Sequence, residues 1–349
     1  MLDCKKLRAK GTAIAALRNA GGDAGMLAHI VITGAAGFIG SHLTDRLLQM
    51  GHTVSGIDNF VRGRRENLCA ASTNRAFHLI EADLSAESGC MDAFAAACKI
   101  APIDAVWHLA ANSDIPAGIA DPSIDLRDTF LTTFQVLGAM RHFGVPTIAF
   151  ASSSAIYGVS QRPLAEDTGP LLPVSNYGAM KLASEGLISA AVESFLSRAY
   201  LLRFPNVVGG RATHGIIFDF VRKLRKSPKA LEVLGDGNQQ KPYLHVSDLV
   251  DAMMFITSHS TDRLNHFNIS LSGEGISVRS IAETVVRLVA PGTPICYGTQ
   301  DRGWVGDVPR FRYSIDKLSA LGWCARLSSM QAVERATLEC YAPTGACSS

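Results

Sequence analysis

The chain has 349 residues, of which 47% are hydrophobic and 18% charged, and its 33 basic and 31 acidic side chains leave a net charge of +2. This composition fits a globular protein with a substantial core, and the charge balance gives no electrostatic reason to expect nucleic acid or a membrane surface as a partner. No apolar run reaches the ~18 residues of a membrane span, and eight scattered cysteines without zinc spacing favour a reduced, cytoplasmic protein that binds no metal.

Residues 1–25 mix five basic side chains with alanine and glycine and contain no apolar block of the kind found in signal peptides. We expect them to form a disordered extension. From residue 26 onward, strand-like apolar runs alternate with helical stretches. Strands are expected at 27–34, 52–58, 76–83, 104–111, 147–153 and 198–204, and helices at 38–51, 86–100, 121–143 and 176–197.

This alternation predicts an α/β fold of Rossmann type, with a doubly wound parallel sheet covered by helices on both faces. The first domain is expected over 26–205. After Phe204, proline, glycine and short mixed elements become frequent. Residues 206–242 and 271–349 are therefore interpreted as a smaller, discontinuous C-terminal domain that binds the substrate, with 243–270 returning to the first domain.

A glycine-rich turn follows the first predicted strand and opens the first predicted helix. Such glycines allow a tight turn and close approach of a pyrophosphate, and the helix N-terminus offers unpaired N–H groups. Asp58 ends the next strand, where a carboxylate can accept hydrogen bonds from the adenosine ribose and would repel a 2′-phosphate. NAD is favoured over NADP, although Arg62 and Arg64 leave NADP open. The turn residues expected to bind the cofactor are Gly34, Gly37, Phe38, Ile39 and Gly40.

Tyr177 and Lys181 are four residues apart on a predicted helix and therefore share one face of it. A tyrosine has an ordinary pKa near 10 and needs help to act as a base near neutrality. The Lys181 ammonium and a positive nicotinamide ring would lower the pKa of Tyr177. The resulting phenolate could remove a proton from a sugar hydroxyl. His108 and His245 have no metal partners at useful spacing and receive no role.

Several short motifs in order resemble the extended short-chain dehydrogenase/reductase family, and within it the nucleotide-sugar epimerases of UDP-glucose 4-epimerase type. They are TGAAGFIG at 33–40, DNF at 58–60, HLAA at 108–111, SSSAIYG at 152–158, YGAMK at 177–181, RFPNVVGGR at 203–211, YLHVSDL at 243–249 and GDVP at 306–309. The resemblance spans about residues 27–323. It implies an NAD-dependent enzyme acting on a nucleotide sugar, most simply a UDP-hexose.

The resemblance also assigns roles residue by residue. Ser153 would share the substrate proton with Tyr177, and Lys181 would hold the nicotinamide ribose. Further cofactor contacts would come from Asn59, Asp83, Leu84, Ala110 and Ala111. Substrate contacts would come from Asn112, Ser153, Asn206, Arg211, Lys241, Arg302 and Phe311.

The departures from the family pattern concern the substrate. Thr129 stands where an asparagine is common. Lys241 stands where the family has an arginine that contacts phosphate, and a lysine cannot form the bidentate hydrogen bonds of an arginine. Trp304 occupies the place of a second phosphate arginine, with Arg302 two residues earlier. Phe311 aligns near the position that limits bulk at the sugar C2 atom and would disfavour an N-acetylhexosamine.

The favoured function is reversible 4-epimerisation through a transient 4-keto sugar. A nucleotide-sugar dehydratase or decarboxylase begins with the same oxidation, but usually carries an Asp-Glu pair where this chain has Ser154-Ala155. Glu166 or Asp167 could substitute for that pair. A ketoreductase and a non-catalytic dinucleotide sensor remain as alternatives. The helices near 121–143 and 176–197 are expected to form a homodimer interface, although Phe130, Leu131, Phe134 and Leu137 could equally be core.

Overall fold

The computed structural model describes residues 27–301, 303 and 308–342. The extension expected at 1–25, and also Arg302 and Trp304, lie outside the described residues. Within the described part, the secondary structure follows the order predicted from the sequence, with one strand or helix for each apolar run up to Phe204.

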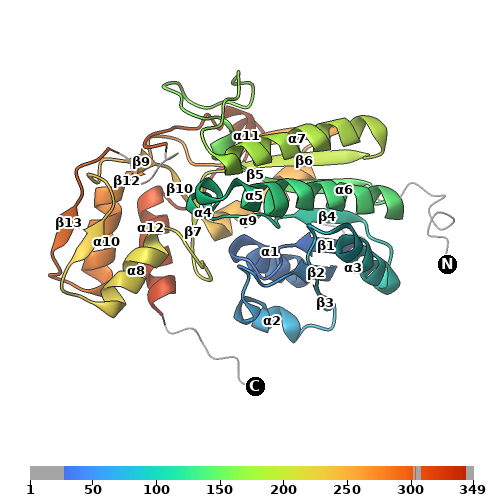
Figure 1. Ribbon diagram of the computed structural model, residues 1–349, viewed down its shortest axis with the longest axis horizontal. Helices are drawn as coiled ribbons and strands as arrows, with labels where there is room; N and C mark the ends of the chain where they lie inside the picture. Colours follow the sequence, from blue (N-terminus) through green and yellow to red (C-terminus); the bar gives the residue numbers. More distant parts are fainter. Residues whose placement is uncertain (1–26, 302, 304–307, 343–349) are drawn as a thin grey trace.

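A seven-stranded sheet forms the centre of the molecule, in the order β11-β6-β5-β4-β1-β2-β3 (Figure 1). Each neighbouring pair is parallel. The strands are β1 (His29–Thr33), β2 (Thr53–Asp58), β3 (Phe77–Glu81), β4 (Ala105–His108), β5 (Thr147–Ser153), β6 (Arg198–Phe204) and β11 (Leu264–Asn268). The predicted doubly wound parallel sheet is confirmed.

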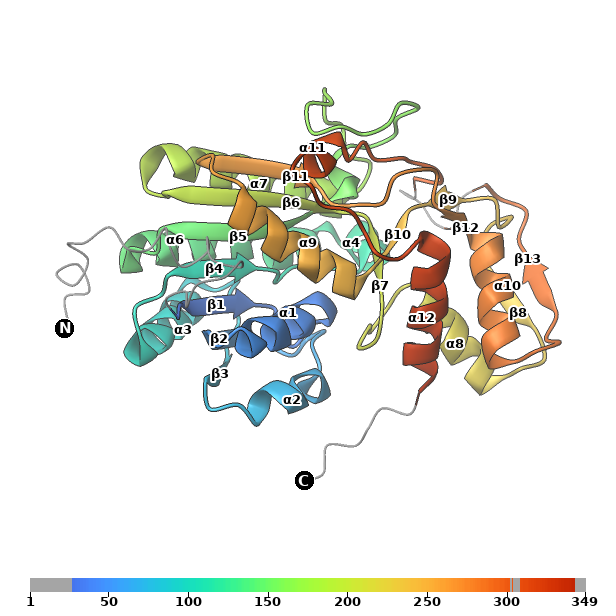
Figure 2. The ribbon, with the colours of Figure 1, turned by 180° about the vertical axis from the view of Figure 1, so that it is seen from behind.

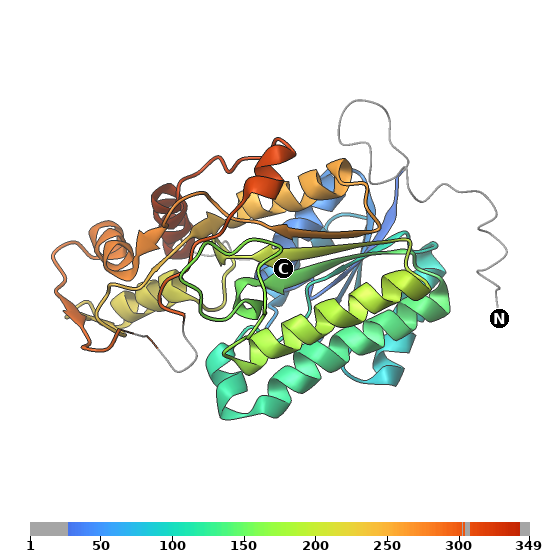
Figure 3. The same cartoon turned by 90° about the horizontal axis from the view of Figure 1, so that it is seen from above.

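Helices cover both faces of this sheet because alternate strand residues point to opposite sides. Ile30 and Ile32 of β1 pack in the core under α1 (Phe38–Gln49) and α9 (Val246–His259). Val31, between them, packs in the opposite core. That second core is covered by α3 (Glu87–Ile100), α6 (Thr132–Phe143) and α7 (Asn176–Ser194), and Figure 3 shows α6 and α7 running side by side along the outer face.

A smaller region with its own apolar core lies at one end of the sheet, on the left of Figure 1 and the right of Figure 2. Its helices are α8 (Ile216–Lys226), α10 (Val278–Val289) and α12 (Ser329–Tyr341). Its short strand pairs are β7 (Asn206–Val208) with β10 (Tyr243–His245), β8 (Leu231–Val233) with β13 (Ile295–Tyr297), and β9 (Gln240–Lys241) with β12 (Ile276–Ser277). The domain boundaries proposed from the sequence stay a prediction.

The helix expected over 121–143 contains an interruption. It begins as α5 (Pro122–Asp125), passes through a π-helical turn at Leu126–Leu131, and continues as α6. A short helix, α4 (Ile115–Ala120), precedes it. Single π-helical turns are frequent at functional sites. This one follows the carboxyl end of β4, at the edge of the sheet where a doubly wound fold binds its ligands.

Candidate active site

The glycine-rich turn after β1 has no room for a side chain at Gly34 or Gly40. Gly34 has φ +70°, and a Cβ atom there would lie 2.9 Å from the backbone nitrogen of Ala110. A Cβ at Gly40 would lie 2.1 Å from the Gly34 carbonyl oxygen. Gly37 caps α1 without a side chain, so no side-chain oxygen of the cap occupies the first N–H groups of the helix. Those groups are suited to bind a diphosphate.

Asp58 closes β2 beside this turn and is buried. Its Oδ2 accepts a hydrogen bond from the Ala36 N–H at 2.9 Å, and its Oδ1 accepts one from the Phe60 N–H at 2.8 Å. Burial raises the pKa of this carboxyl group, and the backbone hydrogen bonds only partly oppose the rise. A carboxylate has about four lone-pair sites, so it retains capacity for ribose hydroxyls.

The other residues expected at the cofactor lie around the same edge of the sheet. Ala110 donates its N–H to the Thr33 hydroxyl at 3.2 Å, beside the glycine turn. Asn59 and Asp83 each cap a turn after their strands, accepting from the N–H of Val61 and Ser85 respectively. The side chain of Leu84 belongs to the core beneath α3, and Ala111 is half-buried after β4.

Tyr177, Ser153 and Lys181 are brought together by α7 and the end of β5. Ser175 caps α7 by accepting from the Gly178 N–H at 3.1 Å. The Ser153 hydroxyl group lies close enough to the Tyr177 phenol to lower its pKa. The Lys181 ammonium donates to the Ala151 carbonyl at 2.7 Å, and its Nζ lies 5.8 Å from the centre of the Tyr177 ring. Tyr177 and Lys181 therefore share one face of α7, as their spacing predicted.

The electrostatics differ from the expectation. Burial raises the pKa of Tyr177 to about 12, although the neighbouring Ser153 opposes the rise. Burial also lowers the pKa of Lys181 to about 7, against the opposing effects of Glu185 and Asp125. The lowering of the pKa of Tyr177 that we expected from Lys181 is therefore not produced by these side chains. A further positive charge is needed beside the phenol.

Asp125 is a buried carboxylate at this site that the sequence reasoning missed. It accepts a hydrogen bond from the side-chain amide of Asn112 at 2.8 Å, while its Oδ2 has no partner in the described part of the chain. Its negative charge raises the pKa of both Tyr177 and Lys181. A Cβ at Gly118 would lie 1.8 Å from this Oδ2, so the glycine makes room for the carboxylate. Thr129, one turn later, accepts from the Asn112 N–H at 3.2 Å.

The residues expected at the substrate do not all lie together: Asn206, Lys241 and Phe311 belong to the smaller region and its border, whereas Arg211 contacts α1. Asn206 begins β7 next to Tyr243, and Lys241 is buried on β9. Phe311 is also buried, packed edge-on to Tyr313 with 5.7 Å between ring centres. Arg211, at φ +65°, instead forms an ion pair of 2.7 Å with Asp45 on α1.

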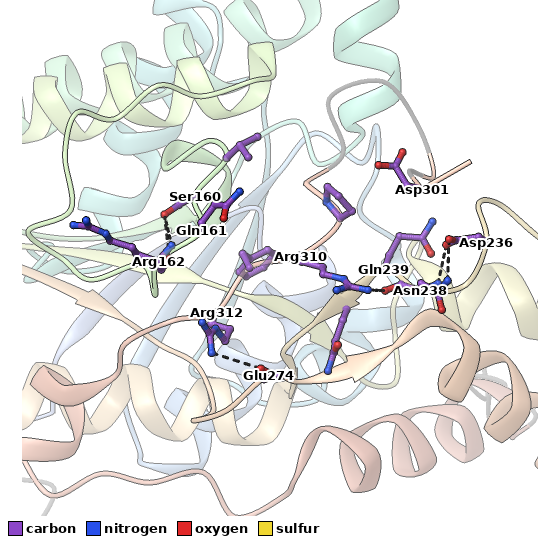
Figure 4. A pocket seen from close by; sticks show the side chains of 14 residues that line it. Ser160, Gln161, Arg162, Asp236, Asn238, Gln239, Glu274, Asp301, Arg310 and Arg312 are labelled. Carbon is purple, nitrogen blue, oxygen red and sulfur yellow. Dashed lines mark hydrogen bonds and ion pairs between the residues drawn. The ribbon is translucent and has the colours of Figure 1, made fainter. Parts of the chain in front are cut away.

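A cavity of about 620 Å³ lies beside Phe311 (Figure 4). Gln239 reaches its wall with only 3% exposure, and neither its amide oxygen nor its amide nitrogen has a partner among the described residues. Two charged residues of the lining, Arg312 and Glu274, form an ion pair with each other at 3.5 Å. The lining consists of Val159, Ser160, Gln161, Arg162, Asp236, Asn238, Gln239, Gln240, Glu274, Asp301, Pro309, Arg310, Phe311 and Arg312.

His108 and His245 serve packing and hydrogen bonding. His108 bonds the hydroxyl groups of Thr33 and Thr133 on either side, and burial lowers its pKa to about 3. His245 caps α9. Within 27–301, 303 and 308–342, no cluster of three or more His, Cys, Asp or Glu side chains is arranged for a metal ion. No helix in that part of the chain is long and apolar enough to span a bilayer.

The chain combines a Rossmann-type sheet, a glycine turn with an acidic residue after the second strand, and a serine beside a tyrosine with a lysine one turn on. These features define a dinucleotide-dependent enzyme of the extended short-chain dehydrogenase/reductase class. The model of the NAD dependent epimerase/dehydratase family matches residues 30–270. The chain belongs to this family, and its cofactor is NAD.

Individual proteins are similar over nearly the whole chain. A UDP-glucose 4-epimerase of Azospirillum brasilense is 29% identical, over 88% of this chain and 90% of its own. The crystal structure of a UDP-galactose 4-epimerase is 34% identical with a TM-score of 0.78, covering 89% of this chain and 98% of that one. The UDP-glucose 4-epimerase of Thermus thermophilus, in complex with NAD, is 28% identical with a TM-score of 0.77 over the same shares.

Proposed function

We propose that this protein is an NAD-dependent 4-epimerase of a nucleotide sugar, most simply a UDP-hexose such as UDP-glucose or UDP-galactose. The observation that carries the proposal is the placement of Ser153 beside the Tyr177 phenol, with Lys181 one helical turn on and the glycine turn at the same edge of the sheet. The similarity to UDP-glucose and UDP-galactose 4-epimerases supports the choice of reaction.

Tyr177 would accept the proton of the sugar 4-hydroxyl group through its phenolate and return it after the 4-keto sugar has turned over. Ser153 would hydrogen-bond the same substrate oxygen and share the proton. NAD, when bound, supplies a hydride acceptor and donor and a positive ring beside the phenol. Lys181 would hold its nicotinamide ribose, the glycine turn its diphosphate, and Asp58 its adenosine ribose.

The pKa shifts at this site support a mechanism in which the side chains position Tyr177 and the bound cofactor lowers its pKa. The side chains alone leave the pKa of Tyr177 at about 12, far from a working base at neutral pH. A positive charge beside a phenol favours the phenolate and lowers its pKa. Tyr177 would thus become a base only in the loaded protein, which ties proton removal to the presence of the hydride acceptor.

We further propose that the cavity beside Phe311 holds the sugar of the substrate. The unpartnered amide of Gln239 offers one donor face and one acceptor oxygen, which suits a pair of sugar hydroxyls. The Phe311 ring provides an apolar wall for the sugar. Lys241 and Asn206 remain our choice for the diphosphate, and the NADP alternative is less favoured because Asp58 stands at the ribose position.

Dehydration or decarboxylation is less well supported than epimerisation. A dehydratase needs an acid and a base near the sugar, and Ala155 supplies neither at the usual place. Glu166, which could substitute, already accepts the Asn268 N–H at 2.8 Å. Asp167 is exposed to solvent. Simple return of the hydride is the outcome that this arrangement favours.

The purified protein should be incubated with UDP-glucose, UDP-galactose and their N-acetyl forms, with no cofactor added. Interconversion of a 4-epimer pair supports the proposal. A product lighter by water or carbon dioxide would replace it with the dehydratase or decarboxylase. Absence of turnover with every nucleotide sugar, despite bound NAD, would favour the non-catalytic sensor.

We also propose that the protein is a cytoplasmic homodimer joined through α6 and α7. Phe134 on α6 is 53% exposed. Gly138 on α6 and Gly186 on α7 have open space where a Cβ would stand, so a second pair of helices can approach closely. The exposed Phe134 ring and the uncovered backbone at Gly138 and Gly186 suit the packing of these helices against a second copy of the chain.

A further inference from the structure

An ion pair joins two loops that are far apart in sequence. Arg62 lies in the loop after β2, and Asp114 lies in the loop after β4. The Arg62 Nη1 and Asp114 Oδ2 atoms are 3.1 Å apart, and the two side chains are 34% and 37% exposed. The sequence left open a contact of Arg62 with the 2′-phosphate of NADP and did not predict Asp114 as its partner.

The order of the strands decides what this pair spans. In the sheet, β4 and β2 are the two neighbours of β1. The glycine turn that follows β1 therefore lies between the loops that carry Arg62 and Asp114. In doubly wound folds, the ligand lies in the crevice outside the carboxyl ends of the strands at this point. The ion pair bridges the edge of the sheet where the dinucleotide binds.

The loop with Arg62 is fastened to the glycine turn. The Arg64 N–H and the Asn67 side-chain amide both donate to the Ala36 carbonyl, at 3.0 and 2.9 Å. A Cβ at Gly63 would lie 2.6 Å from Asp58 Oδ1, so this loop passes directly over the carboxylate proposed to hold the ribose. The residues that directly follow Arg62 are thus held against the glycine turn.

The loop with Asp114 is equally fixed. Asp114 Oδ1 caps α4 by accepting from the Ala117 N–H at 3.1 Å, and the Asp114 N–H donates to Asn112 at 2.9 Å. Although burial opposes it, the Ala117 N–H and Arg62 lower the pKa of Asp114, so the carboxylate stays charged. His214, from the loop before α8, lies close enough to interact electrostatically with both partners.

We propose that the Arg62–Asp114 ion pair is a clasp that closes over bound NAD and slows its release. This inference rests on the proposed function in one respect, since an epimerase must keep one cofactor through both halves of its reaction. Each of the two loops is hydrogen-bonded to its surroundings, so we expect the cofactor to leave when the ion pair opens. Because the partners are partly exposed, the expected effect is a change in release rate of about 1.5- to fivefold.

The test follows the release of isotope-labelled NAD from loaded protein after dilution into unlabelled NAD. Arg62→Ala and Asp114→Asn should each accelerate release about 1.5- to fivefold, and the double variant should add little to either. Asparagine preserves the cap of α4, so Asp114→Asn removes the charge without unwinding the helix. Arg65→Ala is the matched control, because Arg65 begins the short 3-10 helix after this loop but pairs with Glu81 and stacks on Phe60. Its release rate should equal that of the wild type.

The two single variants distinguish a clasp from a phosphate contact. If Arg62 binds a cofactor phosphate directly, Arg62→Ala accelerates release, but Asp114→Asn frees Arg62 and slows release or leaves it unchanged. That result, or unchanged release in both variants, overturns the clasp. Raising NaCl should accelerate release from the wild type more than from Asp114→Asn. Failure of the proposed function would instead appear as normal release without sugar turnover.

Discussion

The hydroxyl group of Tyr177 is the single group on which the proposed chemistry depends. Tyr177→Phe removes it and keeps the ring that packs beside Lys181. We expect kcat with UDP-hexose to fall by about a thousandfold or more, because Tyr177 is the phenol beside Ser153 that would take the substrate proton. The content of bound NAD, measured after denaturation and extraction, should not change.

Tyr297→Phe is the matched control for this substitution. The Tyr297 hydroxyl has no hydrogen-bond partner in the described part of the chain and lies on β13 in the smaller region, so its loss should leave kcat within about twofold. Wild-type turnover in Tyr177→Phe would refute the mechanism. A fall in both variants would indicate a general effect of tyrosine loss on the fold, which thermal melting would reveal.

Gln239 provides a residue-level test of where the sugar lies. Gln239→Ala removes the unpartnered amide, and we expect the KM for UDP-hexose to rise about three- to tenfold, the cost of one uncharged hydrogen bond. Inhibition by UDP, which lacks the sugar, should stay the same. Equal weakening of both would place Gln239 at the nucleotide, and no change in either would show that the amide contacts no part of the substrate.

At this scale the sequence predicted those residues whose roles depend on local spacing. Tyr177 and Lys181 share a helix face, and the glycine turn must follow a strand, so both patterns are visible in the chain itself. Asp125 and Gln239 were not predicted, because a buried, unpartnered polar atom is a property of tertiary packing. Only the fold places the carboxylate of Asp125 against Gly118 and beside Lys181.

The C-terminal helix α12 is fastened to the rest of the molecule by Glu339. Its carboxylate accepts hydrogen bonds from His245 at 3.1 Å, Arg335 at 2.9 Å and the Gly210 N–H at 2.8 Å. Burial alone would raise the pKa of Glu339, but these donors lower it to about 2. A carboxyl group whose pKa is lower in the folded state stabilises the fold above its unfolded pKa, near 4.5, and that stability disappears as the pH falls toward 2.

Glu339→Gln should therefore lower the free energy of unfolding at pH 6 by about 1–3 kcal/mol, and the difference from wild type should shrink at pH 3. Urea unfolding at both pH values measures it. Glu334→Gln, on the same helix, removes a more exposed pairing with Arg287 and should cost less than about 1 kcal/mol at either pH. A Glu339→Gln difference that is the same at both pH values would contradict this account.

Element by element, long periodic segments were predicted and short or irregular ones were not. The apolar runs of β1 to β6 and the helices α1, α3 and α7 lie within a few residues of their expected bounds. The π-helical turn at Leu126–Leu131 was missed, since one extra residue in a helical turn leaves the overall periodicity nearly intact. The two-residue strands β9 and β12 are too short for any alternation to be visible.

At the scale of the whole molecule, the exposed faces of α6 and α7 form the proposed dimer interface. Phe134 is 53% exposed, an unusual position for a phenylalanine on a helix that otherwise buries its apolar side chains. Phe134→Glu places a charge at the centre of the proposed interface. Burying that charge without a partner is costly, so the dimer dissociation constant should rise by at least about a hundredfold.

Sedimentation velocity across a concentration series would measure this change, with Leu338→Glu as the matched control. Leu338 is also 53% exposed and lies on α12, away from α6 and α7. Its replacement by glutamate adds the same charge at an equally exposed apolar position outside the proposed interface. We expect dimers for the wild type and Leu338→Glu, and monomers for Phe134→Glu. A monomeric wild type would refute the dimer itself. A Phe134→Glu variant that remains as dimeric as wild type would refute the interface, because the apolar ring on α6 would then face solvent in the assembly.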